Sequence, residues 1–266
     1  MKNQGNCDTL KQKIKAFCLM DDAFMSKVFE NDFECTEFLL HIIMDKPSLK
    51  VQKVCTQYSI KNLLGRSVRL DVYAIDDEQK RYNIEIQRAD KGAGAKRARY
   101  NSSIIDANSL WVGKDFDELP ETYVIFITEN DVLGGNEPIY HIDRIVKETG
   151  KLFKDGAHII FVNGACRDES PIGLLMHDFF CTNPADMHYE ILANKTRYFK
   201  EEEKGVAVMS GIMEELIDSV LDDEKRESAL RLLKLGKLSN EEIAEGVGLD
   251  VEVVNNLTQE QKVLIS

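Results

Sequence analysis

Two short runs of the sequence are apolar at almost every position, TYVIFIT at 122–128 and AHIIFVN at 157–163. A strand with one face in water alternates apolar and polar residues, so a nearly continuous apolar run indicates a strand that is buried on both faces. Such strands need helices on each side of their sheet. Apolar residues at spacings of three and four predict helices within 10–44, at 95–108, at 143–153 and from about 171 onward. The chain is therefore expected to fold as an α/β core followed by a helical tail.

The length and the charge limit what this core can bind. With 266 residues, of which 43% are hydrophobic, the chain suits one large domain with an extension. We expect an α/β domain over 1–200 and an acidic helical region over 201–266. The formal charge of −12 repels a polyphosphate at long range, so a nucleic acid must meet a local basic patch.

The cysteines and the apolar stretches indicate a cytoplasmic protein. The six cysteines form no CxxC pair, which is typical of reduced thiols rather than of a disulfide framework or a zinc site. The first residues contain no apolar signal core, and no stretch approaches the roughly 18 apolar residues of a membrane span. We expect a soluble protein of the cytoplasm without a membrane partner.

From 68 to 88 the apolar period changes to two, which predicts two strands, VRLDVYAID and YNIEIQR, joined by a turn at 76–80. Antiparallel pairing around residue 78 sets residue 75 opposite 81 and residue 71 opposite 85. Opposed residues share a face of the sheet, and so do alternate residues along one strand. One face then carries the polar set Arg69, Asp71, Tyr73, Asn83, Glu85 and Gln87, and the other carries the apolar set Leu70, Val72, Ala74, Tyr82, Ile84 and Ile86.

This pairing brings the carboxylates of Asp71 and Glu85 to one face, with Cβ atoms ~5 Å apart. Two acids so close repel each other, and burying one ionised carboxylate without a partner costs several kcal/mol. Arg69 on the same face is one source of compensating charge. A hard divalent cation is another, since Mg²⁺ prefers carboxylate oxygens, water and phosphate as ligands. The alternative is an ordinary amphipathic hairpin with a solvated polar face, and the alternation by itself favours that alternative.

Asp71, thirteen further residues and then Glu85-Ile86-Gln87 resemble the D…ExQ form of the PD-(D/E)XK nuclease motif, with Gln87 where the usual motif has lysine. The segment that follows, AKRARYNSSIIDANSLWVGKDFDELPETYVIFIT, is similar to the Rpn family of recombination-promoting nucleases, often described as transposases. DDAFMSKVF and PIGLLMHDFFCTNPADM extend the resemblance to roughly residues 20–200. The short motif is common by chance, whereas the long match with its Arg-Ala-Arg-Tyr run is specific.

The resemblance implies a restriction-endonuclease-like αβββαβ core with a mixed sheet flanked by helices. It also implies that Asp71, Glu85 and the backbone carbonyl of Ile86 hold a metal, Mg²⁺ or alternatively Mn²⁺, for the hydrolysis of DNA. Gln87 takes the place of the lysine, where it can orient the attacking water or contact the phosphate. As an uncharged amide it cannot be the general base, which leaves that role open.

A basic segment follows the second strand of the hairpin. Between Arg88 and Tyr100, five basic residues stand against one acid, a net charge of +4 within thirteen residues. Cations of this kind contact the phosphates of double-stranded DNA and position it without reading its sequence. A solvated helix face is the alternative. The residues expected to contact DNA are Lys96, Arg97, Arg99 and Tyr100.

The other polar features are expected to be structural. Asp21, Asp22 and Glu37 fall on the first helices, where nucleases of the resembled fold sometimes place an extra acid near the metal; a solvated surface is the simpler interpretation. The five histidines show no metal-binding spacing. The segment 237–257 has the pattern of a helix-turn-helix, but 201–266 holds 16 acids against 7 bases. Such a surface repels DNA, so we expect a packing or protein-contact role for it.

Two functions of different classes fit these observations. The first is a metal-dependent DNA endonuclease of low sequence specificity, associated with recombination, transposition or phage defence in a bacterium. The second is a catalytically silent nuclease fold that binds nucleic acid or a protein partner. The matching Asp71, Glu85 and Gln87 favour the first. RNA as the substrate and a homo-oligomeric state are both compatible with the sequence.

Overall fold

A computed structural model describes residues 10–62, 65–88 and 92–265. The chain divides into two compact units, Met1–Val206 and Ala207–Ser266. The sequence-based boundary between residues 200 and 201 remains a prediction.

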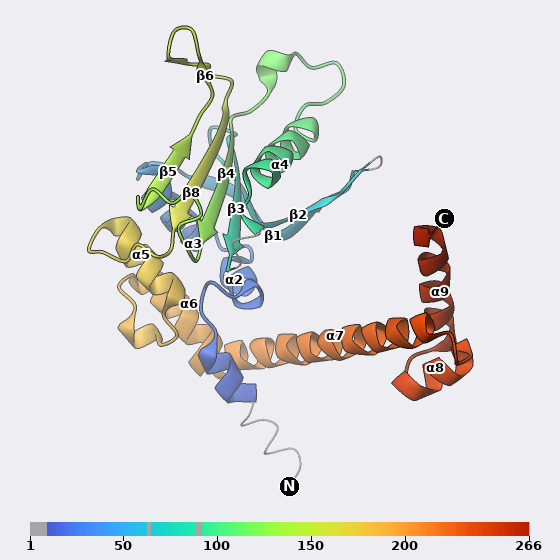
Figure 1. Cartoon of the computed structure of the whole chain (residues 1–266). Coiled ribbons are helices and arrows are strands. Elements are labelled where there is room, and N and C mark those ends of the chain that lie inside the picture. The colour runs from blue at the N-terminus through green and yellow to red at the C-terminus, as the bar shows by residue number, and fades with distance from the viewer. Residues whose placement is uncertain (1–9, 63–64, 89–91, 266) are drawn as a thin grey trace. The chain divides into compact units, whose positions relative to one another are not determined.

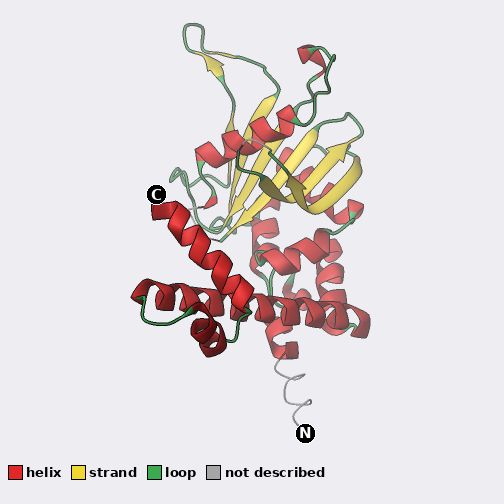
Figure 2. Cartoon of the chain, turned by 90° about the vertical axis from the view of Figure 1, so that its right-hand side faces the viewer, coloured by secondary structure: helices red, strands yellow, loops and turns green. Residues whose placement is uncertain are grey.

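The first unit holds a sheet and the helices that cover it (Figures 1 and 2). A helix over residues 10–16 begins the described chain. After it come α2 (Asp22–Phe29), α3 (Phe33–Met44), β1 (Val51–Ile60), β2 (Val68–Asp76), β3 (Arg81–Gln87), α4 (Ala95–Ala107), η2 (Phe116–Glu118), β4 (Thr122–Thr128), β5 (Ile139–Ile142), β6 (Ile145–Val146), β7 (Lys151–Leu152), β8 (Ala157–Asn163), α5 (Pro171–Phe180), η3 (Pro184–Asp186) and α6 (Glu190–Glu201). From α3 to β4 this order is the predicted αβββαβ.

Six strands form one mixed sheet in the order β1-β2-β3-β4-β8-β5. The central strands β3, β4 and β8 are parallel, while β1, β2 and β5 join antiparallel. The two apolar runs are β4 and β8, and Ile125, Phe126 and Val162 within them have no solvent exposure. Helix α4 packs against β4, and α2 and α3 pack against β1. The predicted fold class, a mixed sheet flanked by helices and followed by a helical region, is confirmed.

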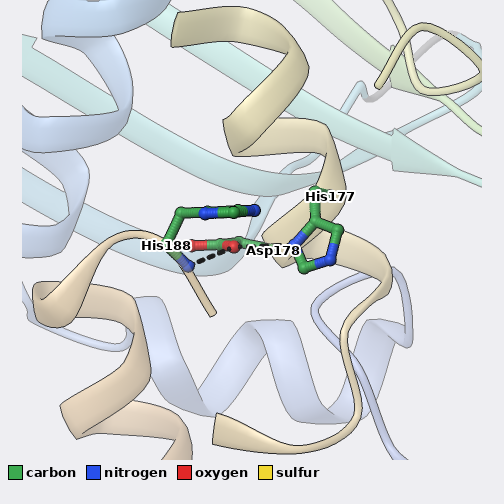
Figure 3. A group of neighbouring side chains, drawn as sticks. All are labelled: His177, Asp178 and His188. Carbon is green, nitrogen blue, oxygen red and sulfur yellow. Dashed lines mark hydrogen bonds and ion pairs between the residues drawn. The ribbon is translucent and has the colours of Figure 1, made fainter. Parts of the chain in front are cut away.

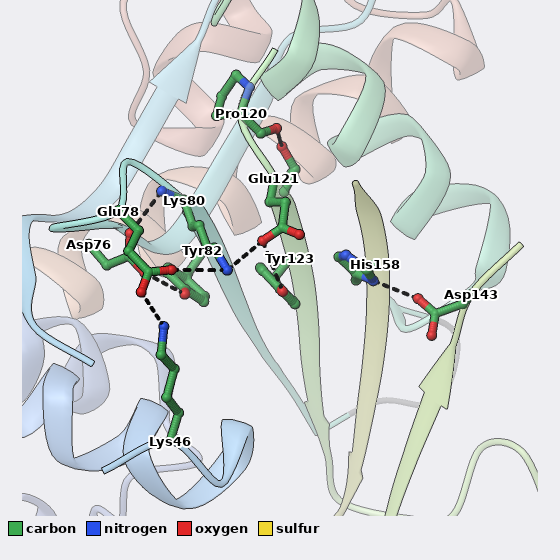
Figure 4. A network of polar contacts seen from close by, with 11 residues as sticks. Lys46, Asp76, Glu78, Lys80, Tyr82, Pro120, Glu121, Tyr123, Asp143 and His158 are labelled. Atoms are coloured by element: carbon green, nitrogen blue, oxygen red, sulfur yellow. Dashed lines mark hydrogen bonds and ion pairs between the residues drawn. The ribbon is translucent and has the colours of Figure 1, made fainter. Parts of the chain in front are cut away.

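The β2–β3 hairpin has the predicted register, with Ile75 opposite Arg81. Its turn is held by the fully buried carboxylate of Asp76, which accepts hydrogen bonds from the Lys80 amide and the Tyr82 hydroxyl, each at 2.8 Å (Figure 4). The turn of a hairpin fixes the register of its strands, and a slip of one residue moves every side chain to the opposite face. This turn therefore decides which side chains of the hairpin meet.

Two parts of the molecule differ from the sequence-based prediction. Strand β1 is not evident from its own pattern, because the pairing shifts between Val51 and Lys53 and the backbone at Gln57 is left-handed, with φ of 52°. The helix predicted over 143–153 is wrong. This segment forms the small β6–β7 sheet, and its chain reverses through Gly150, whose φ of 68° a helix does not allow.

The second unit is helical and contains most of α7 (Glu203–Leu235), with α8 (Asn240–Val247) and α9 (Val251–Ile265). Buried Ile243 and Val254 belong to its core. Ser239 caps α8 by accepting a hydrogen bond from the Glu242 amide, and Gly248 ends α8 with φ of 68°, in agreement with the predicted pattern. Among the residues that the structure describes, none of the helices combines the length and the apolar content that crossing a membrane requires.

Candidate active site

The candidate site lies where β2 and β3 separate. The ladder between them ends at Val72 and Ile84. Beyond it, the Ile86 amide donates to Oδ2 of Asp71 at 3.0 Å, so a side chain replaces the main-chain partner. A strand residue directs its N–H and C=O toward the same edge, so the Ile86 carbonyl is turned toward β2 as well. Two of the three predicted metal ligands, the Asp71 carboxylate and the Ile86 carbonyl, thus face the same gap.

Glu85, the third predicted ligand, is fully buried beneath α4. Its Oε2 accepts from Nη2 of Arg97 at 2.5 Å, and its Oε1 accepts from Nδ2 of Asn101 at 3.3 Å. Arg97 and Asn101 are four residues apart on α4, which places both on the face that covers β3. The same cover leaves Asn83 with no exposure and Asp71 with 9%. The solvated polar face of an ordinary amphipathic hairpin is therefore wrong for this hairpin.

Burial raises the pKa of both carboxyl groups. Desolvation is the largest cause for Asp71, whose pKa the Ile86 amide lowers and the charge of Asp22 raises. For Glu85 the causes are desolvation and then the charge of Asp71. Arg97 lowers both pKa values but does not offset the burial. The pair is therefore short of positive charge, and a divalent cation is a group that would supply it. Two carboxylates and a carbonyl are hard oxygen donors, which fit Mg²⁺ or Mn²⁺.

Asp71, Ile86 and Gln87 line an open cleft of about 1090 Å³. Its walls come from the segment that joins β1 to β2, from the first residues of β2 and from α4. They carry five cationic side chains: Arg66, Arg69, Lys96, Arg97 and Arg99. A cleft of this charge suits a polyanion, and its volume leaves room for water beside the acids.

A comparison with known families agrees with this geometry. The family model described as PD-(D/E)XK nuclease family transposase matches residues 29–165, about half of the chain, which include the two carboxylates and the basic segment. The chain belongs to this family. Comparisons with curated proteins and with solved structures give no match. The resemblance drawn from the sequence is thereby confirmed. Membership indicates a nuclease or transposase role that acts on nucleic acid, and PD-(D/E)XK nucleases generally use divalent metals.

Gln87, which replaces the motif lysine in this PD-(D/E)XK chain, is held in place by its neighbours. Its Oε1 accepts from Nη1 of Arg97 at 3.3 Å. A Cβ atom on Gly92 would lie 1.8 Å from the same Oε1, so a larger residue at position 92 would displace the amide or the backbone. The glycine thus leaves room for the present position of the Gln87 amide, which the sequence alone did not indicate.

The predicted DNA-contacting residues have different surroundings. Lys96, Arg99 and Tyr100 line the cleft from α4, as the basic-patch hypothesis requires. Arg97 lines it too, but its guanidinium is bound to Glu85. Arg88, counted in the same basic segment, pairs instead with Asp21 at 3.5 Å and does not line the cleft. Lys91 lies outside the described residues.

Several cleft residues were missed as members of the site. Asp22 is exposed on α2, as expected, but it also lines the cleft, where it accepts from Nε2 of Gln57 at 2.7 Å. Arg66 belongs to the connection between β1 and β2, which the sequence pattern did not resolve. Asn101 could have been found, because it follows Arg97 at the spacing of one helical turn. Glu37, by contrast, has a structural role, since it accepts from the Val51 amide at 2.8 Å.

A second group of metal-ligating side chains lies outside the cleft. His177, Asp178 and His188 bring one ligand atom each within 4.8 Å of one another (Figure 3). Imidazole nitrogens suit Zn²⁺ or Cu²⁺ rather than Mg²⁺. The Asp178 carboxylate, however, accepts from the amides of His188 and Tyr189, each at 2.8 Å, just before α6 begins. These bonds satisfy the buried Asp178 carboxylate without a metal. The structural role expected for the histidines stays a prediction, because the structure brings His177 and His188 together although their spacing in the sequence did not indicate it.

Proposed function

We propose that the chain is a metal-dependent endonuclease that hydrolyses phosphodiester bonds of DNA at Asp71 and Glu85. The observation that carries the proposal is the burial of two neighbouring carboxyl groups with raised pKa values. Asp71 lines the cleft, and Glu85 is enclosed and paired with Arg97 of the cleft wall. A purely structural pair of acids gains nothing from being left short of positive charge beside an open cleft. Family membership supports the same function.

Asp71, Glu85 and the Ile86 carbonyl are the groups that would hold Mg²⁺, or alternatively Mn²⁺. When bound, such an ion lowers the pKa of a coordinated water and offsets charge on the scissile phosphate. The Gln87 amide, fixed beside the acids, orients water or contacts the phosphate. It carries no proton-accepting group of suitable pKa, so the proton of the attacking water must pass to another base or to solvent.

The cleft walls are suited to a nucleic-acid backbone. Arg66, Arg69, Lys96 and Arg99 offer charge to phosphates, and Tyr100 lines the same cleft. Contacts of this kind position a duplex but do not read its bases, so we propose double-stranded DNA with low sequence specificity as the substrate. A role in transposition, recombination or phage defence within a bacterial cytoplasm is consistent with the family.

The test is cleavage of supercoiled plasmid with Mg²⁺ or Mn²⁺ by the wild type and by Asp71→Asn. We expect nicking that EDTA abolishes and that falls roughly 10³-fold or more in the variant, because the metal contributes several kcal/mol to the barrier. Asp77→Asn is the matched control. Asp77 is an exposed acid on the turn of the same hairpin, and its loss should leave cleavage unchanged.

Two results would overturn the assignment. Equal nicking by wild type and Asp71→Asn would mean a contaminating nuclease or a different site. Binding of DNA without cleavage under any divalent metal would favour the catalytically silent nuclease fold. Parallel digestion of labelled RNA decides whether the same site prefers that substrate.

A further inference from the structure

We propose that Arg97 is a resident cation that occupies Glu85 until the metal enters, and that metal binding transfers its guanidinium to the phosphate backbone in the cleft. This inference rests on the proposed function. It assigns to one side chain two successive partners, a carboxylate without metal and a phosphate with it.

The first observation concerns the ion pair between Arg97 and Glu85. Glu85 has no solvent exposure, and among the described residues Arg97 is the cation within ion-pair distance of it, at 2.5 Å. The other oxygen of Glu85 receives the neutral Asn101 amide. Removal of one partner from such a buried pair leaves an uncompensated charge. Arg97 therefore supplies the charge that the buried acid needs when no other cation is present.

The second observation is that Arg97 is free to leave. Its side chain is 40% exposed and lines the cleft, whereas Glu85 is enclosed. Its other contacts are hydrogen bonds from Nη1, at 3.3 Å to Gln87 Oε1 and 3.2 Å to the Gly92 carbonyl, and a position over the Phe126 ring at 5.9 Å from its centroid. An arginine on a flexible stem that faces an open cleft can turn outward without any movement of the backbone.

The third observation is the position of Arg97 on its helix. Helix α4 has no acid in its first turn, and Lys96 and Arg97 stand there instead. The positive end of a helix dipole disfavours cations at this place and favours anions. The carboxylate of Glu85 supplies a negative charge beside Arg97. A phosphate in the cleft would supply that negative charge instead. The same helix end then faces the charge that it prefers.

Simple electrostatics makes the two states exclusive. A divalent ion on the Glu85 carboxylate would stand within a few ångströms of a guanidinium that keeps its present contact, and like charges at such distances repel strongly in a poorly solvated site. Metal and Arg97 therefore compete for Glu85. Entry of the metal adds an arginine to the cleft wall at the step at which the site becomes competent.

The test is Mn²⁺ binding by isothermal titration calorimetry at pH 8 without DNA, for the wild type, Arg97→Gln and Arg99→Gln. Loss of the competing charge-assisted hydrogen bond should tighten Mn²⁺ binding on the order of 10-fold in Arg97→Gln. Arg99→Gln is the matched control. It removes the same charge from the same helix and cleft, but Arg99 has no contact with Glu85 among the described interactions, so its effect should be much smaller.

Arg97→Lys keeps the positive charge and serves as a control for a folding defect in Arg97→Gln. The affinity of Arg97→Lys for Mn²⁺ should stay near that of the wild type. At saturating Mn²⁺, Arg97→Gln should still cleave plasmid more slowly than the wild type, because the phosphate contact is lost.

Weaker or unchanged Mn²⁺ binding in Arg97→Gln would overturn the competition, and so would equal tightening in Arg97→Gln and Arg99→Gln. Those results leave the proposed function intact if plasmid cleavage still requires Asp71. Absence of Mn²⁺ binding in every variant would overturn both.

Discussion

Asp178 and Glu85 are both fully buried carboxylates of the first unit, yet their partners differ in kind. Both oxygens of Asp178 accept from backbone amides, those of His188 and Tyr189 just before α6, and Oδ1 also lies 3.1 Å from Nδ1 of the His177 ring. Glu85 accepts from two side chains of α4, those of Arg97 and Asn101. Backbone amides cannot leave without unfolding the element, whereas side chains can. The comparison separates an acid that holds the fold from an acid whose partner can be exchanged.

Asp76 is nearer to Asp178 than to Glu85, although one of its two partners is a side chain, which is itself buried. It is buried at the hairpin turn and accepts from the Lys80 amide and the Tyr82 hydroxyl. Asp71 stands between the two kinds, because it accepts from the Ile86 amide and also lines the cleft. A buried acid alone is thus a weak sign of function. A buried acid with exchangeable partners beside an open cleft is a stronger one.

The largest stability difference should be between Asp178→Asn and Glu85→Gln. In Asp178→Asn an amide N–H₂ must face a backbone N–H, so a buried donor is left unsatisfied, and the free energy of unfolding should fall by about 1–3 kcal/mol. Glu85→Gln removes a charge that burial disfavours, so metal-free stability should change little or rise. Urea denaturation measures both. A loss in Glu85→Gln as large as that in Asp178→Asn would show that Glu85 is a structural acid too.

A smaller effect is expected from Gly92→Ala. Its Cβ would lie 1.8 Å from Oε1 of Gln87, so the Gln87 amide must leave its present position in the cleft. We expect plasmid cleavage to fall about 10-fold, the scale typical of residues that orient a metal site. Gly94→Ala is the matched control, because a Cβ there meets nothing within 4 Å. Equal loss in both variants would point to the loop backbone and not to Gln87.

The smallest effect is a change in the pH dependence of metal-free stability. The folded-state pKa values of Asp71 and Glu85 are raised by burial, so the folded chain holds their protons more tightly than the unfolded chain. Their contribution is fully present below about pH 4, near the ordinary carboxyl pKa, and is lost as the pH rises through the raised values. Thermal melts from pH 4 to 8 should therefore lose stability more steeply in the wild type than in the Asp71→Asn, Glu85→Gln double variant. Parallel curves would contradict the raised pKa values.

The sequence was informative where local pattern and turn chemistry agree. The alternation in β2 and β3 with the polar turn between them predicted the register of the hairpin that carries Asp71 and Glu85, and the apolar runs predicted two buried strands of the sheet. The sequence-based prediction failed where the strand pairing is irregular and where a glycine with positive φ reverses the chain. The pairing shift near Val51 hides β1, and Gly150 turns an expected helix into a hairpin.

The chemistry of the site was only partly readable. The alternation of polar and apolar residues could not show that α4 covers the polar face of the hairpin. That alternation is the same whether the polar face meets water or a helix. Arg97 was recognised as part of a cationic run, but its contact with Glu85 depends on how α4 crosses β3. Spatial pairing of this kind, like that of Asp22 with the cleft, is a property of the fold and not of the local sequence.

The most direct measurement is anomalous X-ray diffraction from crystals of the wild-type chain soaked in MnCl₂. The account predicts an anomalous peak roughly 2.0–2.3 Å from oxygens of Asp71 and Glu85 and from the Ile86 carbonyl, with the Arg97 guanidinium turned away from Glu85. Bound Mn²⁺ at other positions only, with Arg97 still on Glu85, would contradict it.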